Sequence, residues 1–133
     1  MTDTPGGTQP EDVEPEGVAR IEWWSIPEVA EALGVRDRDV RGMISDRTVV
    51  AVRRGGRAPV IPAAFVVESP EGGNMIVGRL RGSVIQLSDA GFADEEIVAW
   101  LFRDNDELGS TPIQALTELR THAVRRSAQA LAF

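Results

Sequence analysis

The sequence has no cysteine and a single histidine, His122, among its 133 residues. Without cysteine there is no disulfide framework and no thiolate chemistry. One histidine excludes a catalytic histidine pair and a multi-histidine metal site. A phosphate-binding loop is missing too, because Gly72-Gly73 lacks the lysine and the helix start that such a loop requires. We therefore predict a protein that is not an enzyme and that holds no metal or other cofactor.

Long apolar runs are also missing, since no window reaches the roughly 18 consecutive apolar residues of a membrane span. Residues 1–16 are polar and acidic, whereas a signal peptide has a basic start and an apolar middle. We therefore expect a cytoplasmic protein with no membrane contact. Hydrophobic residues still make up 42% of the chain, which is enough for a folded core.

Negative charge predominates, with a net charge of −7, but it is unevenly distributed. Residues 1–22 hold six acids and one arginine, and residues 89–107 hold seven acids and one arginine. Between them, residues 36–57 carry seven arginines and three aspartates. Because salt screens charges beyond roughly 10 Å, a phosphate near residues 36–57 responds mainly to this local positive charge. The net charge therefore does not exclude binding to nucleic acid.

A first helix is predicted at about residues 26–33. Ser25 and Glu28 have the spacing of a capping box, in which each side chain accepts a hydrogen bond from the backbone N–H of the other. Gly34 follows where a left-handed residue commonly ends a helix.

A second helix is predicted at about residues 37–46, with Asp37 as its N-cap. Apolar side chains follow it at helical spacing, namely Val40, Met43 and Ile44. Only a tight turn around Gly34 separates the two helices. This arrangement is typical of a helix-turn-helix, whose second helix enters the major groove of DNA.

An arginine-rich hairpin is predicted next. Residues 49–52 and 58–61 have the composition of strands, and the Gly-Gly pair between them favours a tight primed turn. Because proline cannot donate to a sheet ladder, Pro59 predicts that the second strand lies at a sheet edge. The hairpin tip, residues 53–57, holds three arginines and has the place of a wing.

Helices are also expected near the C-terminus. Ser83 is predicted to cap the first of them and Gly91 to end it, and Asp94 is predicted to cap the second. Thr111-Pro112 then begins one long helix, with Thr111 as its cap. The predicted apolar face of this long helix consists of Ile113, Leu116, Leu119, Ala123, Val124 and Leu131.

These patterns predict a mainly α fold with a small β-hairpin wing. A disordered acidic tail is expected at residues 1–20 and a winged helix-turn-helix at 21–67, ending in a short helical turn over 63–67. A connector with at most one short strand follows at 68–82, and a C-terminal helical region at 83–133. We interpret the large aromatic side chains beside helix starts as core residues: Trp23, Trp24 and Trp100.

A resemblance to known families rests on two patterns. Residues 25–66, from Ser-Ile-Pro-Glu-Val-Ala-Glu-Ala-Leu-Gly-Val to Val-Ile-Pro-Ala-Ala-Phe, resemble the winged helix-turn-helix of the excisionase and MerR type. The span 21–133 resembles a family of small actinobacterial DNA-binding proteins, with Gly-Phe/Tyr-x-x-x-Glu-Ile-x-x-Trp-Leu-Phe at Gly91 to Phe102. This resemblance implies sequence recognition by the helix at 37–46 and backbone or minor-groove contacts by the wing at 53–57.

A second resemblance concerns the C-terminal helices. Residues 84–131 are similar to the toxin-binding C-terminal domain of Xre-type antitoxins, through Gly91-Phe92, Trp100-Leu101 and Thr111-Pro112. It implies that these helices bind a protein partner.

We predict a DNA-binding protein that regulates transcription, with double-stranded DNA as its partner. Two alternatives stay open, an antitoxin-like protein-interaction module and an excisionase-like DNA-architecture factor. One small domain covers little DNA, so a homodimer or tandem binding is also expected. Arginine is the commonest side chain that contacts guanine edges. The candidate DNA-binding residues are Arg36, Arg38, Asp39 and Arg41 around the second helix, and Arg53, Arg54 and Arg57 in the wing.

Overall fold

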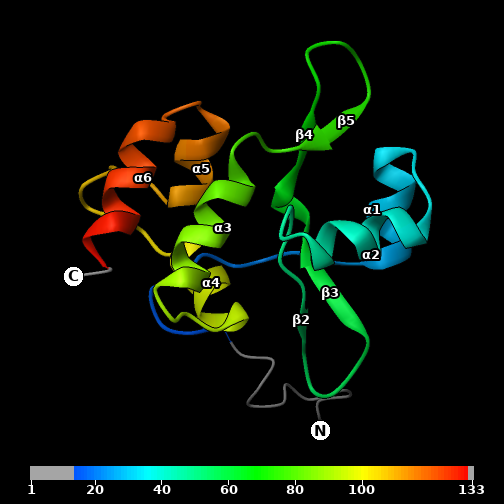
Figure 1. Cartoon of the computed structure of the whole chain (residues 1–133), viewed down its shortest axis with the longest axis horizontal. Helices are drawn as coiled ribbons and strands as arrows, with labels where there is room; N and C mark the ends of the chain where they lie inside the picture. The colour runs from blue at the N-terminus through cyan, green and yellow to red at the C-terminus, as the bar shows by residue number, and fades with distance from the viewer. Residues whose placement is uncertain (1–13, 132–133) are drawn as a thin grey trace, which may run out of the picture.

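The computed structural model describes residues 14–131. Figure 1 shows the first helices of the chain at one end of the molecule, the C-terminal helices at the other, and the strands between them. The fold is mainly helical with a small antiparallel sheet, as the sequence predicts. The elements are β1 (Trp23–Ser25), α1 (Ile26–Leu33), α2 (Asp37–Ser45), β2 (Val52–Arg53), β3 (Pro59–Pro62), the 3₁₀ turn η2 (Ala63–Phe65), β4 (Val66–Glu68), β5 (Asn74–Ile76), α3 (Leu80–Asp89), α4 (Asp94–Leu101), α5 (Pro112–Thr117) and α6 (Thr121–Ala130).

Helix α1 begins and ends as predicted. Ser25 Oγ accepts a hydrogen bond from the Glu28 N–H at 3.2 Å, and the Ser25 N–H donates to Glu28 Oε1 at 2.7 Å. Gly34 follows with a φ of 72°, the left-handed conformation that ends the helix and turns the chain toward α2. Val29 of α1 and Val40 of α2 are both buried, so the two helices pack on one core.

The main sheet has the strand order β1-β3-β2, so β3 is its central strand. This corrects our prediction that Pro59 places its strand at an edge. Strand β1, which the sequence analysis missed, pairs only with the residues from Val60 to Pro62. Pro59 is the first residue of β3 and pairs only with Arg53 of β2. The first position of a strand tolerates proline because its missing N–H need not join the hydrogen-bond ladder there.

A second hairpin stands where a connector was expected. Strands β4 and β5 pair from Val66↔Ile76 to Glu68↔Asn74. The helical turn predicted to reach Val67 therefore ends earlier, at the buried Phe65, because the following residues pair as a strand. The Asn74 side chain donates to the carbonyl of Ala32 at 2.9 Å and holds the hairpin against α1.

Residues 14–20, here called the N-terminal strap, pack against the C-terminal helices. The Ala19 N–H donates to the Phe102 carbonyl at 2.7 Å, and Val18 forms a β-bridge with Arg103. Val18 also packs against the hydrophobic core. Our prediction of a disordered tail is thereby corrected for residues 14–20, because these contacts fix them. The remainder of the predicted tail, residues 1–13, lies outside the described residues.

Two predicted helix caps are replaced by others. Helix α3 begins at Leu80, so Ser83 is a buried residue inside the helix and not its cap. Helix α4 has Ala93 at its N-cap, and Glu96 Oε1 accepts a hydrogen bond from the Ala93 N–H at 2.8 Å. Asp94 is therefore not the N-cap, and its carboxylate instead contacts Arg47, as described below.

The long C-terminal helix predicted from Thr111 is broken into α5 and α6. Its start is as predicted, since Thr111 Oγ1 accepts from the Gln114 N–H at 3.2 Å. The break lies at Leu119, which has a φ of 64° and a side chain that is 81% exposed. The Arg120 guanidinium next to it donates to the Leu108 carbonyl at 2.6 Å. The predicted apolar face is therefore wrong at Leu119, and also at Leu131, which is exposed.

One hydrophobic core runs through both ends of the molecule. Phe65, from the turn after β3, lies with its ring centroid 6.0 Å from that of Phe102, just after α4. Within residues 14–131, no helix is long and apolar enough to cross a membrane.

Candidate nucleic-acid interface

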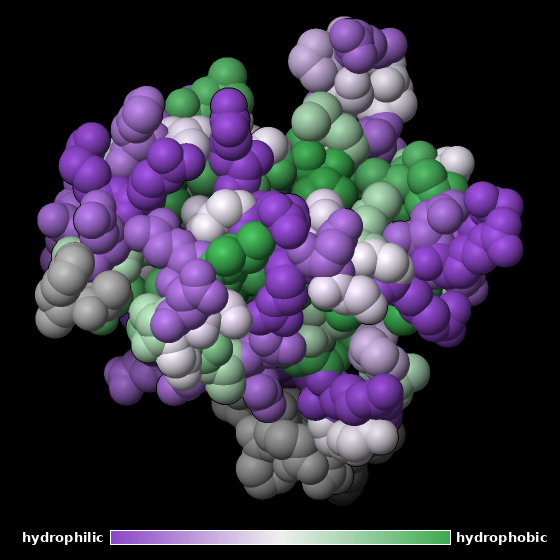
Figure 2. Space-filling model, viewed as in Figure 1, coloured by the Kyte–Doolittle hydropathy of each residue, from purple (hydrophilic) through white to green (hydrophobic). Residues whose placement is uncertain are grey.

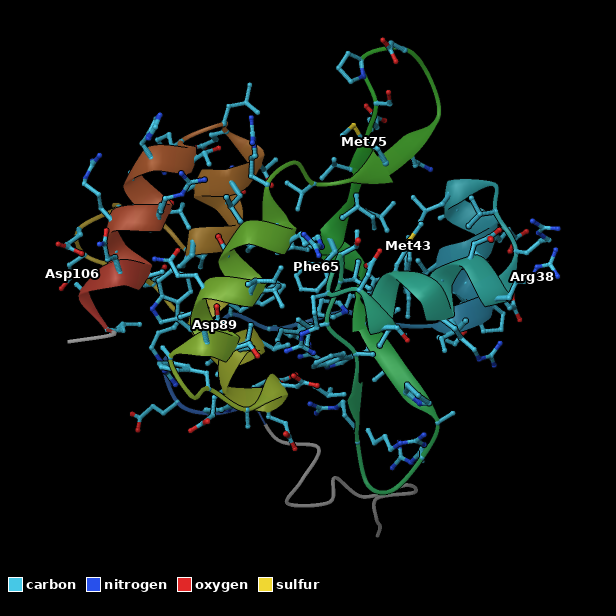
Figure 3. All side chains as sticks on the ribbon, in the orientation of Figure 1. Arg38, Met43, Phe65, Met75, Asp89 and Asp106 are labelled. Carbon is cyan, nitrogen blue, oxygen red and sulfur yellow. The ribbon has the colours of Figure 1, made fainter. Side chains whose placement is uncertain are left out.

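Helix α2 turns one side to the core and leaves the other open. Val40 is buried, and Met43 and Ile44 are half-buried against the core. Figure 3 shows Met43 toward the interior, whereas Arg38 lies at the outer edge of the molecule and points away from it. Residues three, four and seven positions apart share one side of a helix. The exposed side, which we call the outer face of α2, consists of Arg38, Arg41, Gly42 and Ser45.

The outer face is basic at Arg38 and Arg41 and open at Gly42. Within the described residues 14–131, neither arginine is held by a hydrogen bond or an ion pair. A Cβ added at Gly42 would meet nothing within 4 Å, so the helix backbone is uncovered there. A glycine inside a helix costs roughly 0.5–1 kcal/mol relative to alanine. Because no side chain covers Gly42, a bulky partner can come close to the backbone of α2.

Arg36 and Asp39 hold the N-terminal end of α2. Arg36 is the N-cap, which corrects the prediction for Asp37, now the first residue of the helix. Asp39 Oδ2 accepts from the Arg36 N–H at 3.0 Å and from Arg36 Nε at 3.3 Å. The backbone hydrogen bond from Arg36 is the main cause that lowers the pKa of the Asp39 carboxyl. Asp39 therefore caps the helix and orients Arg36. The prediction that Asp37 is the N-cap did not anticipate this contact.

The wing tip, residues 53–57, runs from the last residue of β2 toward β3 at the bottom of the view in Figure 1. Gly55 and Gly56 have φ values of 65° and 76°, the conformation of the tight primed turn that the sequence predicts. Arg53 and Arg57 are exposed, and Arg53 Nη1 donates to the Arg57 carbonyl at 3.3 Å. The wing therefore presents these two guanidinium groups at its tip.

Arg54 is placed differently from the other wing arginines. Its side chain is only 16% exposed, and its guanidinium lies 4.7 Å from the centre of the Trp23 ring. Arg54 Nη1 contacts Glu14 Oε1 at 3.2 Å, and Trp23 Nε1 donates to Glu14 Oε2 at 3.1 Å. Glu14 of the strap therefore joins the wing to β1. Sequence reasoning missed this contact because it placed Glu14 in a disordered tail.

Arg47 belongs to the same arginine-rich stretch but contacts the C-terminal region. Its Nη2 lies 2.9 Å from Asp94 Oδ1 at the start of α4. Arg47 has a φ of 70°, so the chain turns sharply just after α2. The contact fixes the C-terminal end of α2 against α4.

Within residues 36–57, the exposed arginines therefore lie along α2 and at the wing tip. Figure 2 shows hydrophilic side chains over the end of the molecule that α1 and α2 form. Five of the seven predicted residues are exposed, namely Arg36, Arg38, Arg41, Arg53 and Arg57, whereas Asp39 and Arg54 are half-buried. Arg36 and Asp39 bind each other. No group of three or more histidine or acidic side chains within residues 14–131 is arranged to hold a metal ion.

Comparisons with known proteins match two successive parts of the chain to two family models. Residues 12–66 match the family model described as "DNA-binding protein Rv2175c, wHTH domain", and residues 77–132 match "Rv2175c C-terminal domain of unknown function". A relative from Mycobacterium tuberculosis (strain ATCC 25618 / H37Rv), named DNA-binding protein Rv2175c, is 34% identical over 122 residues. That match covers 83% of this chain and 80% of the relative. The chain belongs to the Rv2175c family.

The solved NMR structure of Rv2175c has the same fold as this chain. It aligns with a TM-score of 0.72 and 29% identity, and the alignment covers 99% of each chain. The Rv2175c family model for the winged helix-turn-helix spans α1, α2 and the wing. The winged helix-turn-helix part of the sequence resemblance is thus confirmed, while its excisionase, MerR and antitoxin details stay predictions.

Proposed function

We propose that the chain is a DNA-binding transcriptional regulator that contacts the major groove with the outer face of α2. The observation that carries this proposal is that face itself, with Arg38 and Arg41 exposed beside an open Gly42 on the second helix of a helix-turn-helix. Such helices lie in the major groove with side chains toward the base edges. The match to a family model of a DNA-binding winged helix-turn-helix supports the same function.

Arg38 and Arg41 are the side chains that we assign to the bases. They lie one turn apart on the outer face, and arginine forms a two-pronged hydrogen bond with the O6 and N7 atoms of guanine. Gly42 allows the groove to approach the helix backbone closely. Arg36 is held by Asp39 at the helix start, where we assign it to a phosphate.

Arg53 and Arg57 are the wing side chains that we assign to phosphate. Both are exposed at the tip of a glycine turn that lets the backbone come close to DNA. Phosphate contacts position a protein on the duplex but carry no sequence information. Arg54, packed on Trp23 and bound to Glu14, holds the wing in place.

Fluorescence anisotropy with labelled genomic fragments, including the DNA upstream of the protein's own coding sequence, tests these assignments. The variants are Arg38→Gln with Arg41→Gln, and Arg53→Gln with Arg57→Gln. Arg125→Gln, an exposed residue on α6, is the control for charge alone. We expect the α2 variant to lose preference between fragments by about 1–3 kcal/mol per lost base contact.

The wing variant has a different expected signature. It weakens binding to every fragment to a similar degree, and its affinity depends less steeply on salt because fewer counterions are released. No binding of the wild-type chain to any fragment at low salt would contradict the proposed function. Loss of fragment preference in the wing variant and not in the α2 variant would reverse the two assignments.

A further inference from the structure

Arg81, at the start of α3, lies at the C-terminal end of α2. Its Nε donates to the carbonyl of Asp46 at 2.7 Å, and Asp46 is the C-cap of α2. Figure 1 shows α2 pointing toward α3 in the centre of the view. The Arg81 side chain is exposed, so it reaches the solvent where the outer face of α2 ends.

Negative charge gathers at this end of α2. The last carbonyl groups of a helix carry a partial negative charge. The Asp46 carboxylate adds a full one, and hydrogen bonds from the Thr48 hydroxyl and backbone N–H lower the pKa of its carboxyl. A DNA strand that follows the outer face past Ser45 would therefore meet repulsion unless a cation stands there. Arg81 is that cation.

Arg81 carries the positive charge at this end of α2, where its charge helps to lower the pKa of the Asp46 carboxyl. Residues 72–88 contain two arginines, Arg79 and Arg81, and no acid. Within residues 14–131, the Arg81 guanidinium has the single hydrogen bond through Nε and no ion pair. Nε is thus fixed on the helix end, while the two terminal amino groups are available to an acceptor. A guanidinium in this state is suited to bind a phosphate group.

We propose that Arg81 is a phosphate-binding residue of the DNA interface. It binds the backbone that borders the major groove at the C-terminal end of α2, as a third contact beside α2 and the wing. The inference rests on the proposed function, and it extends the interface from the winged helix-turn-helix into the C-terminal region. Arg79, the N-cap of α3, is also exposed.

A purely structural role for Arg81 predicts a different result. A side chain that only caps the carbonyl of Asp46 stabilises α2, and its loss lowers stability without changing how many counterions DNA binding releases. A phosphate contact adds to the slope of log affinity against log salt, by about 0.9 per contact with duplex DNA. The slope therefore separates the two roles.

The test uses the full chain and a double-stranded fragment that the wild type binds. Anisotropy titrations at about 50 to 200 mM salt give the slope for Arg81→Gln, Arg81→Lys and Arg125→Gln. We expect Arg81→Gln to lose about 3- to 10-fold in affinity at low salt and about 0.9 in slope. Arg81→Lys keeps the wild-type slope because it keeps the charge, and Arg125→Gln, on α6, keeps both slope and affinity.

Thermal unfolding of each variant identifies changes that come from stability. The slope is compared among folded proteins, and at a lower temperature for a variant that unfolds earlier. An unchanged slope for Arg81→Gln overturns the proposal, and so does an equal loss of slope for Arg125→Gln. If the wild type binds no DNA, the proposed function itself fails; if it binds and only the Arg81 result is negative, the proposed function stands.

Discussion

At the scale of single residues, the wing arginines divide into two kinds. Arg53 and Arg57 are exposed, whereas Arg54 lies on the Trp23 ring and contacts Glu14. Sequence reasoning treated the three alike because they share one loop. The division means that a triple substitution of the wing would mix a loss of DNA contacts with a loss of stability.

Arg54→Ala should destabilise the fold, whereas Arg53→Ala should not. Removing Arg54 removes the cation–π contact and leaves Glu14 without its wing partner, which we expect to cost about 1–2 kcal/mol. Arg53 makes one exposed hydrogen bond, so its loss should stay within about 0.5 kcal/mol. Urea unfolding followed by tryptophan fluorescence measures both. Equal free energies of unfolding for the two variants would show that the contact with Trp23 contributes nothing.

At the scale of elements, α2 combines good helix signals with one residue that weakens it. Gly42 lies in the helix interior, on the outer face, with no atom near its missing side chain. Nothing in the packing of the fold requires a glycine at this position. The close approach of DNA that we propose for this face gives a reason for a glycine there.

Gly42→Ala should therefore raise stability and lower DNA affinity. The free energy of unfolding should rise by about 0.5–1 kcal/mol, because alanine is the better helix former. The added methyl group points at the proposed major-groove surface and should weaken binding to a specific fragment. Chemical unfolding and anisotropy measure the two effects. Ser45→Ala, on the same face, is the comparison for a change that adds no bulk, and higher stability with unchanged affinity would place Gly42 outside the interface.

Elements with local signals were predictable from the sequence, and those with distant partners were not. The capping box of Ser25 and Glu28 and the glycine turn of the wing lie within a few residues, so helix α1 and the wing turn were predicted correctly. Strand β1 forms only because β3, more than thirty residues later, pairs with it. The break before α6 depends on Arg120, which reaches a carbonyl 12 residues away.

The same reasoning applies to the candidate interface. The outer face of α2 follows from helical spacing, so Arg38 and Arg41 could be named in advance. The contact of Arg81 with Asp46 joins residues 35 positions apart, and that of Arg54 with Glu14 joins residues 40 apart. Sequence spacing carries no signal for such pairs, because tertiary packing alone brings them together.

At the scale of the whole molecule, the winged helix-turn-helix and the C-terminal helices are joined by core packing and by polar contacts. The core is continuous between them, and Arg47 with Asp94 and the N-terminal strap add contacts between the two parts. If Arg81 binds phosphate, the C-terminal region also contributes directly to the interface. We therefore expect the chain to unfold as one cooperative unit.

Phe102→Ala tests this cooperativity, because Phe102 is buried against Phe65 and its carbonyl holds Ala19 of the strap. We expect a loss of about 3–5 kcal/mol, the usual cost of emptying a buried phenylalanine site. Circular dichroism, which follows the helices at both ends, and the fluorescence of the three tryptophans, Trp23, Trp24 and Trp100, should report one shared transition. Leu119→Ala, at an exposed site, should change stability by less than about 0.5 kcal/mol. Two separate transitions in the Phe102 variant would show that the winged helix-turn-helix folds independently of the C-terminal helices.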